Sequence, residues 1–239
     1  MMRKIKTLGL AVGATLALSA ALASAAQAET GVLTTGGFPS IVTGQKINPG
    51  PTFDIGAVRT VSCATSRLDG TLVGPTDPVT FKPTYEGCSS EPGFTPVTVT
   101  TNGCDYNVGF RKPGTTNQPA TTGLMHAWLN CPVGQKIEIH VYEDAASHAE
   151  NISTCTYDIG PQGPVPAGIY HNTFGALPDV DATINARFTA RSTIGAGGPV
   201  CGGDPMTQHL PITLTGIHTL RAYQDNGGVE GAPISLDVG

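Results

Sequence analysis

This chain of 239 residues has little charge and few aromatic side chains. Only 13% of its residues are Asp, Glu, Lys or Arg, 6% are aromatic, and Trp128 is the single tryptophan. Basic residues are too scarce to form the positive surface that binds phosphate backbones, so nucleic acid is not expected as a partner. The low aromatic content also argues against an extended sugar-binding cleft, which needs several stacking platforms.

The motifs of familiar enzymes and metal sites are missing as well. The sequence has no G-x-S-x-G, H-E-x-x-H or S-x-x-K signature of a hydrolase. It has no C-x-x-C pair of a zinc or redox site and no D-x-D-x-D-G calcium loop. The glycines of segment 195–205 carry no G-K-[ST] and follow no βα unit, which argues against a phosphate-binding loop. We therefore assign no catalytic residue and no cofactor.

One long apolar run is present, and it lies at the N-terminus. A basic start precedes the apolar stretch 8–25, and Ala26-Gln27-Ala28 fits the small-x-small rule for signal cleavage. We expect residues 1–28 to be a bacterial export signal, so that the mature protein begins at Glu29 and is secreted, extracellular or periplasmic. No second run of this length follows, so no transmembrane span is expected.

Cleavage of the signal makes the protein more acidic. Residues 1–28 hold three basic and no acidic side chains, which leaves ten Lys and Arg against 18 Asp and Glu, a formal charge of −8. Anionic membrane surfaces are therefore not expected partners. Segment 29–52 is rich in Gly, Pro, Thr and Ser and is interpreted as an extended lead-in. Residues 53–239 are long enough for a single all-β domain.

All six cysteines lie after the signal, which predicts disulfides in an oxidising compartment. Six cysteines allow 15 connectivities. Pairing each cysteine with its nearest neighbour gives Cys63–Cys88, Cys104–Cys131 and Cys155–Cys201. The middle pair has the best support, because a strand at 104–110 that returns through the loop 112–122 brings its two cysteines nearly opposite each other.

Alternation of apolar and polar residues marks half-buried antiparallel strands through most of the mature chain. The clearest segments are 124–131, 136–142 and 180–191, and weaker ones include 53–67, 78–85 and 95–101, with Asp69-Gly70 as a turn. About eleven strands follow from this pattern, with no amphipathic helix after the signal. The expected fold is a single antiparallel β-sandwich held by disulfides.

The segment 124–142 resembles a β-hairpin whose turn is centred on Val133. This register places Leu129 opposite Ile137 on the core face and Trp128 opposite Glu138 on the other face. An indole beside hydrogen-bonding side chains is typical of a surface that binds a flat ligand. The predicted binding residues on that face are His126, Trp128, Asn130, Glu138, His140 and Tyr142. The alternative is that a loop such as 143–151 or 195–205 covers Trp128, which then only packs.

Histidine and carboxylate side chains raise the further alternative of a metal site. His126 and His140 are cross-strand neighbours in the hairpin register, and His148 lies among acidic residues in 143–150. No recognised ligand spacing is present, however, and acidic loops such as Asp179-Val180-Asp181 usually serve turns. We therefore assign no metal.

The sequence favours a secreted, disulfide-bonded β-protein that acts by binding or as a structural component of a surface. A carbohydrate or another surface protein is the expected partner. The alternative is a secreted glycoside hydrolase that uses Asp and Glu carboxylates, since such pairs carry no local motif. Two carboxylates about 5–10 Å apart in a cleft would favour the hydrolase, and an open surface around Trp128 would favour binding.

Overall fold

The computed structural model describes residues 30–56, 59–75, 78–91, 95–112, 122–150, 153–194, 201 and 209–238. Within these ranges all strand pairings are antiparallel, and the one helix is the five-residue α1 (Ala145–Ala149). The all-β prediction is confirmed, with fifteen strands, several of them very short, in place of about eleven. No helix of the described part is long and apolar enough to cross a membrane.

The chain crosses the sheet eight times, and we call each crossing a pass. A pass is either one long strand or two shorter strands that lie end to end. Thus β6 and β7 lie end to end along β5, and β8 and β9 lie end to end along β10 and β11. The pair β10 and β11 in turn follows β12. The strands are β1 (Thr30–Gly31), β2 (Leu33–Thr35), β3 (Ser40–Ile55), β4 (Arg59–Leu72), β5 (Val79–Glu91), β6 (Thr95–Thr100), β7 (Asp105–Arg111), β8 (Thr122–Asn130), β9 (Ile137–Val141), β10 (Cys155–Ile159), β11 (Gln162–Asn172), β12 (Val180–Ile194), β13 (His209–Asp225), β14 (Glu230–Ile234) and β15 (Leu236–Val238).

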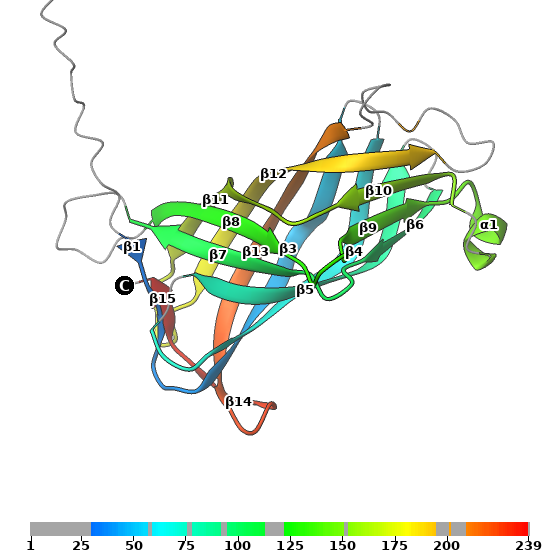
Figure 1. The fold of residues 1–239 in the computed structure, drawn as a ribbon. Coiled ribbons are helices and arrows are strands. Elements are labelled where there is room, and N and C mark those ends of the chain that lie inside the picture. The colour runs from blue at the N-terminus through cyan, green and yellow to red at the C-terminus, as the bar shows by residue number, and fades with distance from the viewer. Residues whose placement is uncertain are drawn as a thin grey trace, which may run out of the picture.

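The eight passes close on themselves, because the last one pairs with the first. Strand β13 is hydrogen-bonded to β12 on one side and to β3 on the other. Figure 1 shows these long strands wrapped around a common interior. Each strand therefore presents one face to the interior and one to the outside. The hydrogen bonding makes one continuous sheet of thirteen strands plus the two-stranded sheet β2–β15, and it does not divide into the two sheets of a sandwich.

The connections alternate between the two ends of this closed sheet. One end carries the connections β2–β3, β4–β5, β7–β8, β11–β12 and β13–β14. The other carries the β9–β10 connection with α1, at the far right of Figure 1. At the first end the small sheet β2–β15 packs into the core, since Leu33, Leu236 and Val238 are fully buried.

The three disulfides are Cys63–Cys88, Cys104–Cys131 and Cys155–Cys201, as predicted. Cys63 and Cys88 are directly opposite each other on β4 and β5. Cys104 and Cys131 flank the last pair of β7 and β8, at the point where both passes are interrupted. Adjacent strands pair throughout the closed sheet, which explains why neighbouring cysteines meet. Three disulfides indicate an oxidising, non-cytoplasmic compartment.

The predicted hairpin of 124–142 has the wrong strand partners, but its residues lie on the predicted faces except for Tyr142, which is buried. Strand β8 pairs with β7 and β11, whereas β9 pairs with β6 and β10. The segment 131–136 lets the chain continue in the same direction instead of reversing it. Leu129 and Ile137 are nevertheless buried, and Trp128 and Glu138 lie on the outer face. Alternation encodes the face of a residue, and two collinear strands show the same alternation as two paired ones.

Two further segments differ from the sequence-based interpretation. Asp69 and Gly70 do not form a turn but lie inside β4, opposite Lys82 and Phe81. A Cβ at position 70 would lie 3.1 Å from Cδ1 of Phe81, so the glycine leaves room for that ring. Residues 40–52, assigned to the extended lead-in, belong to β3, which pairs with both β4 and β13.

Candidate functional site

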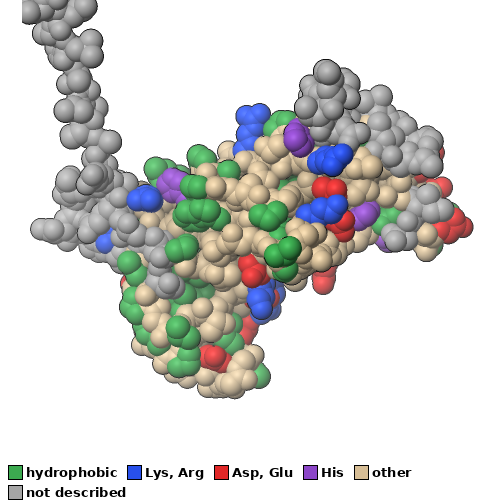
Figure 2. All heavy atoms as spheres, viewed as in Figure 1, with side chains coloured by type: hydrophobic (Ala, Val, Ile, Leu, Met, Phe, Trp, Pro, Cys, Tyr) green, Lys and Arg blue, Asp and Glu red, His purple; other side chains and the backbone are tan. Residues whose placement is uncertain are grey.

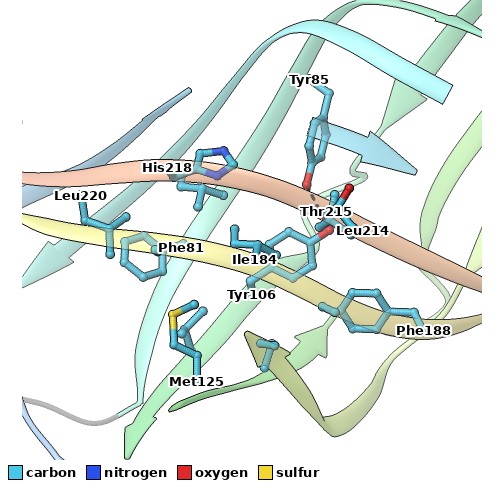
Figure 3. A pocket seen from close by; sticks show the side chains of 16 residues that line it. Phe81, Tyr85, Tyr106, Met125, Ile184, Phe188, Leu214, Thr215, His218 and Leu220 are labelled. Carbon is cyan, nitrogen blue, oxygen red and sulfur yellow. Dashed lines mark hydrogen bonds between the residues drawn. The ribbon is translucent and has the colours of Figure 1, made fainter. Parts of the chain in front are cut away.

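The interior of the closed sheet contains a small apolar cavity, shown in Figure 3. Its volume is about 40 Å³. One water molecule needs about 10–15 Å³ by this kind of measure, and a cavity that accepts benzene is about 150 Å³. The interior is therefore filled by protein side chains and is too small for an organic ligand. Its lining includes Phe81, Tyr106, Met125, Ile184, Phe188 and Leu214.

Two polar pairs lie beside the cavity. The hydroxyls of Tyr85 and Tyr106 are 3.2 Å apart, as the dashed line in Figure 3 marks, and burial raises the pKa of Tyr106 to about 12. Nε2 of His218 lies 2.8 Å from Oγ of Ser66, and burial lowers the pKa of His218 to about 4. His218 is therefore neutral at pH 7 and, with Ser66, forms a buried hydrogen bond between β13 and β4.

We expect acidification to destabilise the protein through His218. The unfolded chain binds the proton near pH 6.5 and the folded chain only near pH 4. Stability from this group is complete above pH 6.5 and is lost as the pH falls towards 4, by about 2 kcal/mol at pH 5. Urea midpoints between pH 8 and 4.5 measure the loss. His218→Gln should flatten this part of the pH dependence, whereas His171→Gln, at an exposed histidine, should not. Parallel curves for wild type and His218→Gln would contradict the assignment.

The six predicted binding residues do not form one surface. His126, Trp128 and Asn130 belong to β8, whereas Glu138 and His140 belong to β9. Tyr142 follows β9 and is buried, with its ring 4.7 Å from that of His148. His126 is opposite Gly109 and Pro166, and His140 is opposite Thr98 and Thr156. The two histidines are thus not cross-strand neighbours, and the geometric basis for a shared metal site is wrong. Within the described ranges no group of three His, Cys, Asp or Glu side chains could hold a metal ion.

The β9 residues take part in an ion-pair network on the outer face. Nζ of Lys136 lies 2.5 Å from Asp158 and 3.4 Å from Glu138, and Asn102 donates to Glu138 at 2.9 Å. The bond to Asp158 raises the pKa of Lys136. Partial burial opposes ionisation of Glu138, but the Asn102 bond and the Lys136 charge together lower its pKa. Lys136 thus links Glu138 of β9 to Asp158 of β10, and the network holds these two strands together.

The β8 residues lie on an outer wall formed by β7, β8 and β11. The half-buried Trp128 is opposite Asn107 of β7. On its other side, a Cβ at Gly163 would lie 2.8 Å from Cα of Trp128 and 3.2 Å from Cδ1 of its indole. Gly163 has φ +129, which a residue with a side chain rarely adopts. The irregular β11 strand therefore lies closely against the indole. The Trp128 wall is defined by Asn107, Leu124, His126, Trp128, Asn130 and Ile169.

An apolar pair extends the wall beyond the indole. Leu124 is directly opposite Ile169, and these side chains are 55% and 41% exposed. Polar groups border them: the exposed Arg111 of β7 is directly opposite Leu124, and the half-buried His126 follows Leu124 on the same face of β8. An apolar centre with a polar border is the usual composition of a protein interface. The alternation that places Trp128 on the outer face places Leu124 there too, but the predicted binding residues do not include it, and Ile169 could be found only from its pairing.

A second concave feature is an open groove beside β4, β5 and the β13–β14 turn. Its volume is about 500 Å³, and charged side chains line it. Arg67 donates to Asp69 at 2.5 Å and also to Glu230. A hydrolase of the expected kind needs two carboxyl groups free to reach a substrate, and Asp69 and Glu230 are both bonded to Arg67. The groove therefore does not favour the hydrolase.

Comparison with protein-family models, curated proteins and solved structures found no match for this chain. Its function is therefore inferred from the cavity, the groove and the wall. The cavity is too small for a ligand and the ion pairs of the groove are mutually satisfied, which leaves the wall as the candidate functional site.

Proposed function

We propose that this chain is a secreted binding protein that recognises a partner protein through the Trp128 wall. The cleavable N-terminal signal that the sequence predicts and the three disulfides support a role outside the cytoplasm. The observation that carries the proposal is the exposed Leu124–Ile169 pair, which lies on the same outer face of the sheet as Trp128, four residues away along β8.

The composition of the wall distinguishes a protein partner from a carbohydrate. A sugar ring stacks on the open face of an aromatic ring, but the indole of Trp128 is half-buried and lies against β11. The exposed apolar residues of the wall, Leu124 and Ile169, are aliphatic. A patch of exposed aliphatic side chains matches the centre of a protein interface, where burying the exposed parts of this pair contributes about 2 kcal/mol.

The proposal predicts that negative charge on the wall abolishes partner binding. The double variant Leu124→Glu/Ile169→Glu places two charges at exposed positions and should leave the fold intact. Cross-linking of the mature protein, residues 29–239, to cell-surface proteins identifies the partner. A titration with that partner, followed by the fluorescence of Trp128, then gives the affinity. We expect the double variant to bind at least about 100-fold more weakly.

The matched control is Val133→Glu, because Val133 is fully exposed and lies off the wall. This variant should bind the partner as the wild type does. Equal affinity of the wild type and the double variant would show that the wall is not the binding surface. If the protein bound glycans on an array but no protein partner, and the double variant lost this binding, the wall would still be the binding surface but its partner would be a carbohydrate.

A further inference from the structure

Large apolar side chains are exposed on the turns at one end of the closed sheet. Phe38 lies between β2 and β3, Val73 after β4, and Val229 between β13 and β14. Phe174 and Leu177 lie between β11 and β12. Their exposed fractions are 40% for Phe38, 86% for Val73, 74% for Phe174, 50% for Leu177 and 66% for Val229. We call this set of five residues the apolar end.

Backbone hydrogen bonds place these turns beside one another. Asp225 N donates to Pro39 O at 3.3 Å, and Gly36 N donates to Ser235 O at 3.0 Å. Leu236 N donates to Pro178 O at 2.8 Å, which joins the C-terminal segment to the β11–β12 turn. Ser40 is opposite both Leu72 and Gln224, so the β4 and β13 strands end together. In the view of Figure 2, hydrophobic side chains gather over the left and lower-left part of the molecule.

The opposite end of the sheet is acidic. The exposed residues Glu143, Asp144 and Glu150 surround α1 there, and Asp and Glu are visible at the far right of Figure 2. In the described part of the connections at that end, no large apolar side chain is exposed. In the described connections, large exposed apolar side chains thus occur at one end only, although carboxylates such as Glu230 and Asp237 lie at that end as well.

The apolar residues protrude from separate turns instead of forming a flat face. A Cβ at Gly37, Gly74 or Gly175 would meet no atom within 4 Å, so the backbone beside these residues is open to its surroundings. The same is true of Gly227 and Gly228 in the β13–β14 turn. A protein partner would need a separate pocket for each protruding side chain. The interface of a lipid bilayer accepts all of them, because it adapts to each side chain.

The path of the chain also favours the apolar end as the end of the fold that faces a membrane. Strand β1 begins at Thr30, which pairs with Arg111 at the end of β7, so the chain enters the fold at the apolar end. The preceding sequence contains the apolar run 8–25. While that signal is held in a membrane during export, the apolar end is the part of the fold nearest to the bilayer.

We propose that the apolar end seats on the surface of a lipid bilayer by inserting its five side chains into the interfacial region. The basic groups Arg221 and Arg67 near these turns are paired with carboxylates, Arg221 with Asp179 at 3.2 Å and Arg67 with Glu230, and the sequence predicts an acidic mature chain. The binding is therefore driven by apolar burial and does not need anionic lipid. It uses residues outside the Trp128 wall and leaves that wall free beside the membrane.

Vesicles of pure phosphatidylcholine test this proposal by co-sedimentation with the mature protein. We expect the wild type to partition onto them, and the triple variant Phe38→Ser/Phe174→Ser/Leu177→Ser to partition at least about tenfold more weakly. Addition of phosphatidylserine should not strengthen binding. The wall variant Leu124→Glu/Ile169→Glu should bind vesicles as the wild type does, so that failure of this proposal and failure of the proposed function are separate results.

A fluorescence experiment reports which side chains enter the bilayer. In a Trp128→Phe background, Phe174→Trp should give an emission maximum that shifts to the blue on vesicle addition, whereas Val133→Trp should give none. Near-UV circular dichroism establishes that each variant is folded. The proposal is overturned if the wild type does not bind phosphatidylcholine vesicles, if the triple variant binds equally well, or if binding requires anionic lipid.

Discussion

Replacing Gly168 by alanine is expected to lower the free energy of unfolding by about 4 kcal/mol or more, a large fraction of a typical net stability of about 5–15 kcal/mol. Gly168 has φ +125, a backbone conformation that residues with a side chain rarely adopt. A Cβ at this position would lie 1.9 Å from the carbonyl oxygen of Thr183. Thr183 belongs to the backbone of β12, which is held by pairs to both β11 and β13, so it cannot move away without breaking the ladder.

Gly160 provides the matched control for this substitution. No atom lies within 4 Å of a Cβ at Gly160, and its φ is not in the left-handed region. Gly160→Ala should therefore leave the stability unchanged or raise it by up to about 1 kcal/mol, because alanine restricts the unfolded chain. Urea unfolding followed by circular dichroism compares the two variants. Equal midpoints would mean that β11 does not approach β12 as the structure has it.

The face of each strand residue could be predicted from the sequence because burial alone determines alternation. Along β12, Val180, Ala182, Ala186 and Phe188 are buried as the pattern predicts, and Arg187 on the other face is exposed. The disulfides could be predicted for a related reason. Paired strands bring Cys63 opposite Cys88 and Cys104 close to Cys131, and Cys155 of β10 reaches Cys201, which follows β12, the partner strand of β10.

The partners of the strands could not be predicted in the same way. The segment 131–136 contains Pro132 and Gly134, which suit a hairpin turn as well as an interruption between two collinear strands. Choosing between them requires knowing that β6–β7 and β10–β11 flank both strands, and this information lies elsewhere in the chain. The predicted binding residues therefore lie on two separate strands, β8 and β9, although each residue except Tyr142 is on the predicted face.

The Leu124–Ile169 pair shows why the candidate site was only partly visible in the sequence. Strand β11 has two register shifts, between Gln162 and Val165 and between Pro166 and Gly168. Each shift moves the following residues relative to β8, so counting along the chain does not lead from Trp128 to Ile169. Trp128 could be selected by its type alone, because it is the only tryptophan, but the Leu124–Ile169 pair on the same face depends on the three-dimensional pairing.

Leu129→Ala is expected to cost about 2–5 kcal/mol of stability, the range for a leucine removed from a packed core. Leu129 is 1% exposed, on the interior face of β8. Leu124→Ala deletes the same atoms from the same strand, but Leu124 is 55% exposed and should cost less than about 1 kcal/mol. Glu138→Ala should likewise cost about 1 kcal/mol or less, because its ion pair with Lys136 is partly exposed. Urea midpoints of the three variants at pH 7 measure these losses of stability. Similar losses for Leu124→Ala and Leu129→Ala would mean that the interior of the closed sheet does not lie on the face assigned to it.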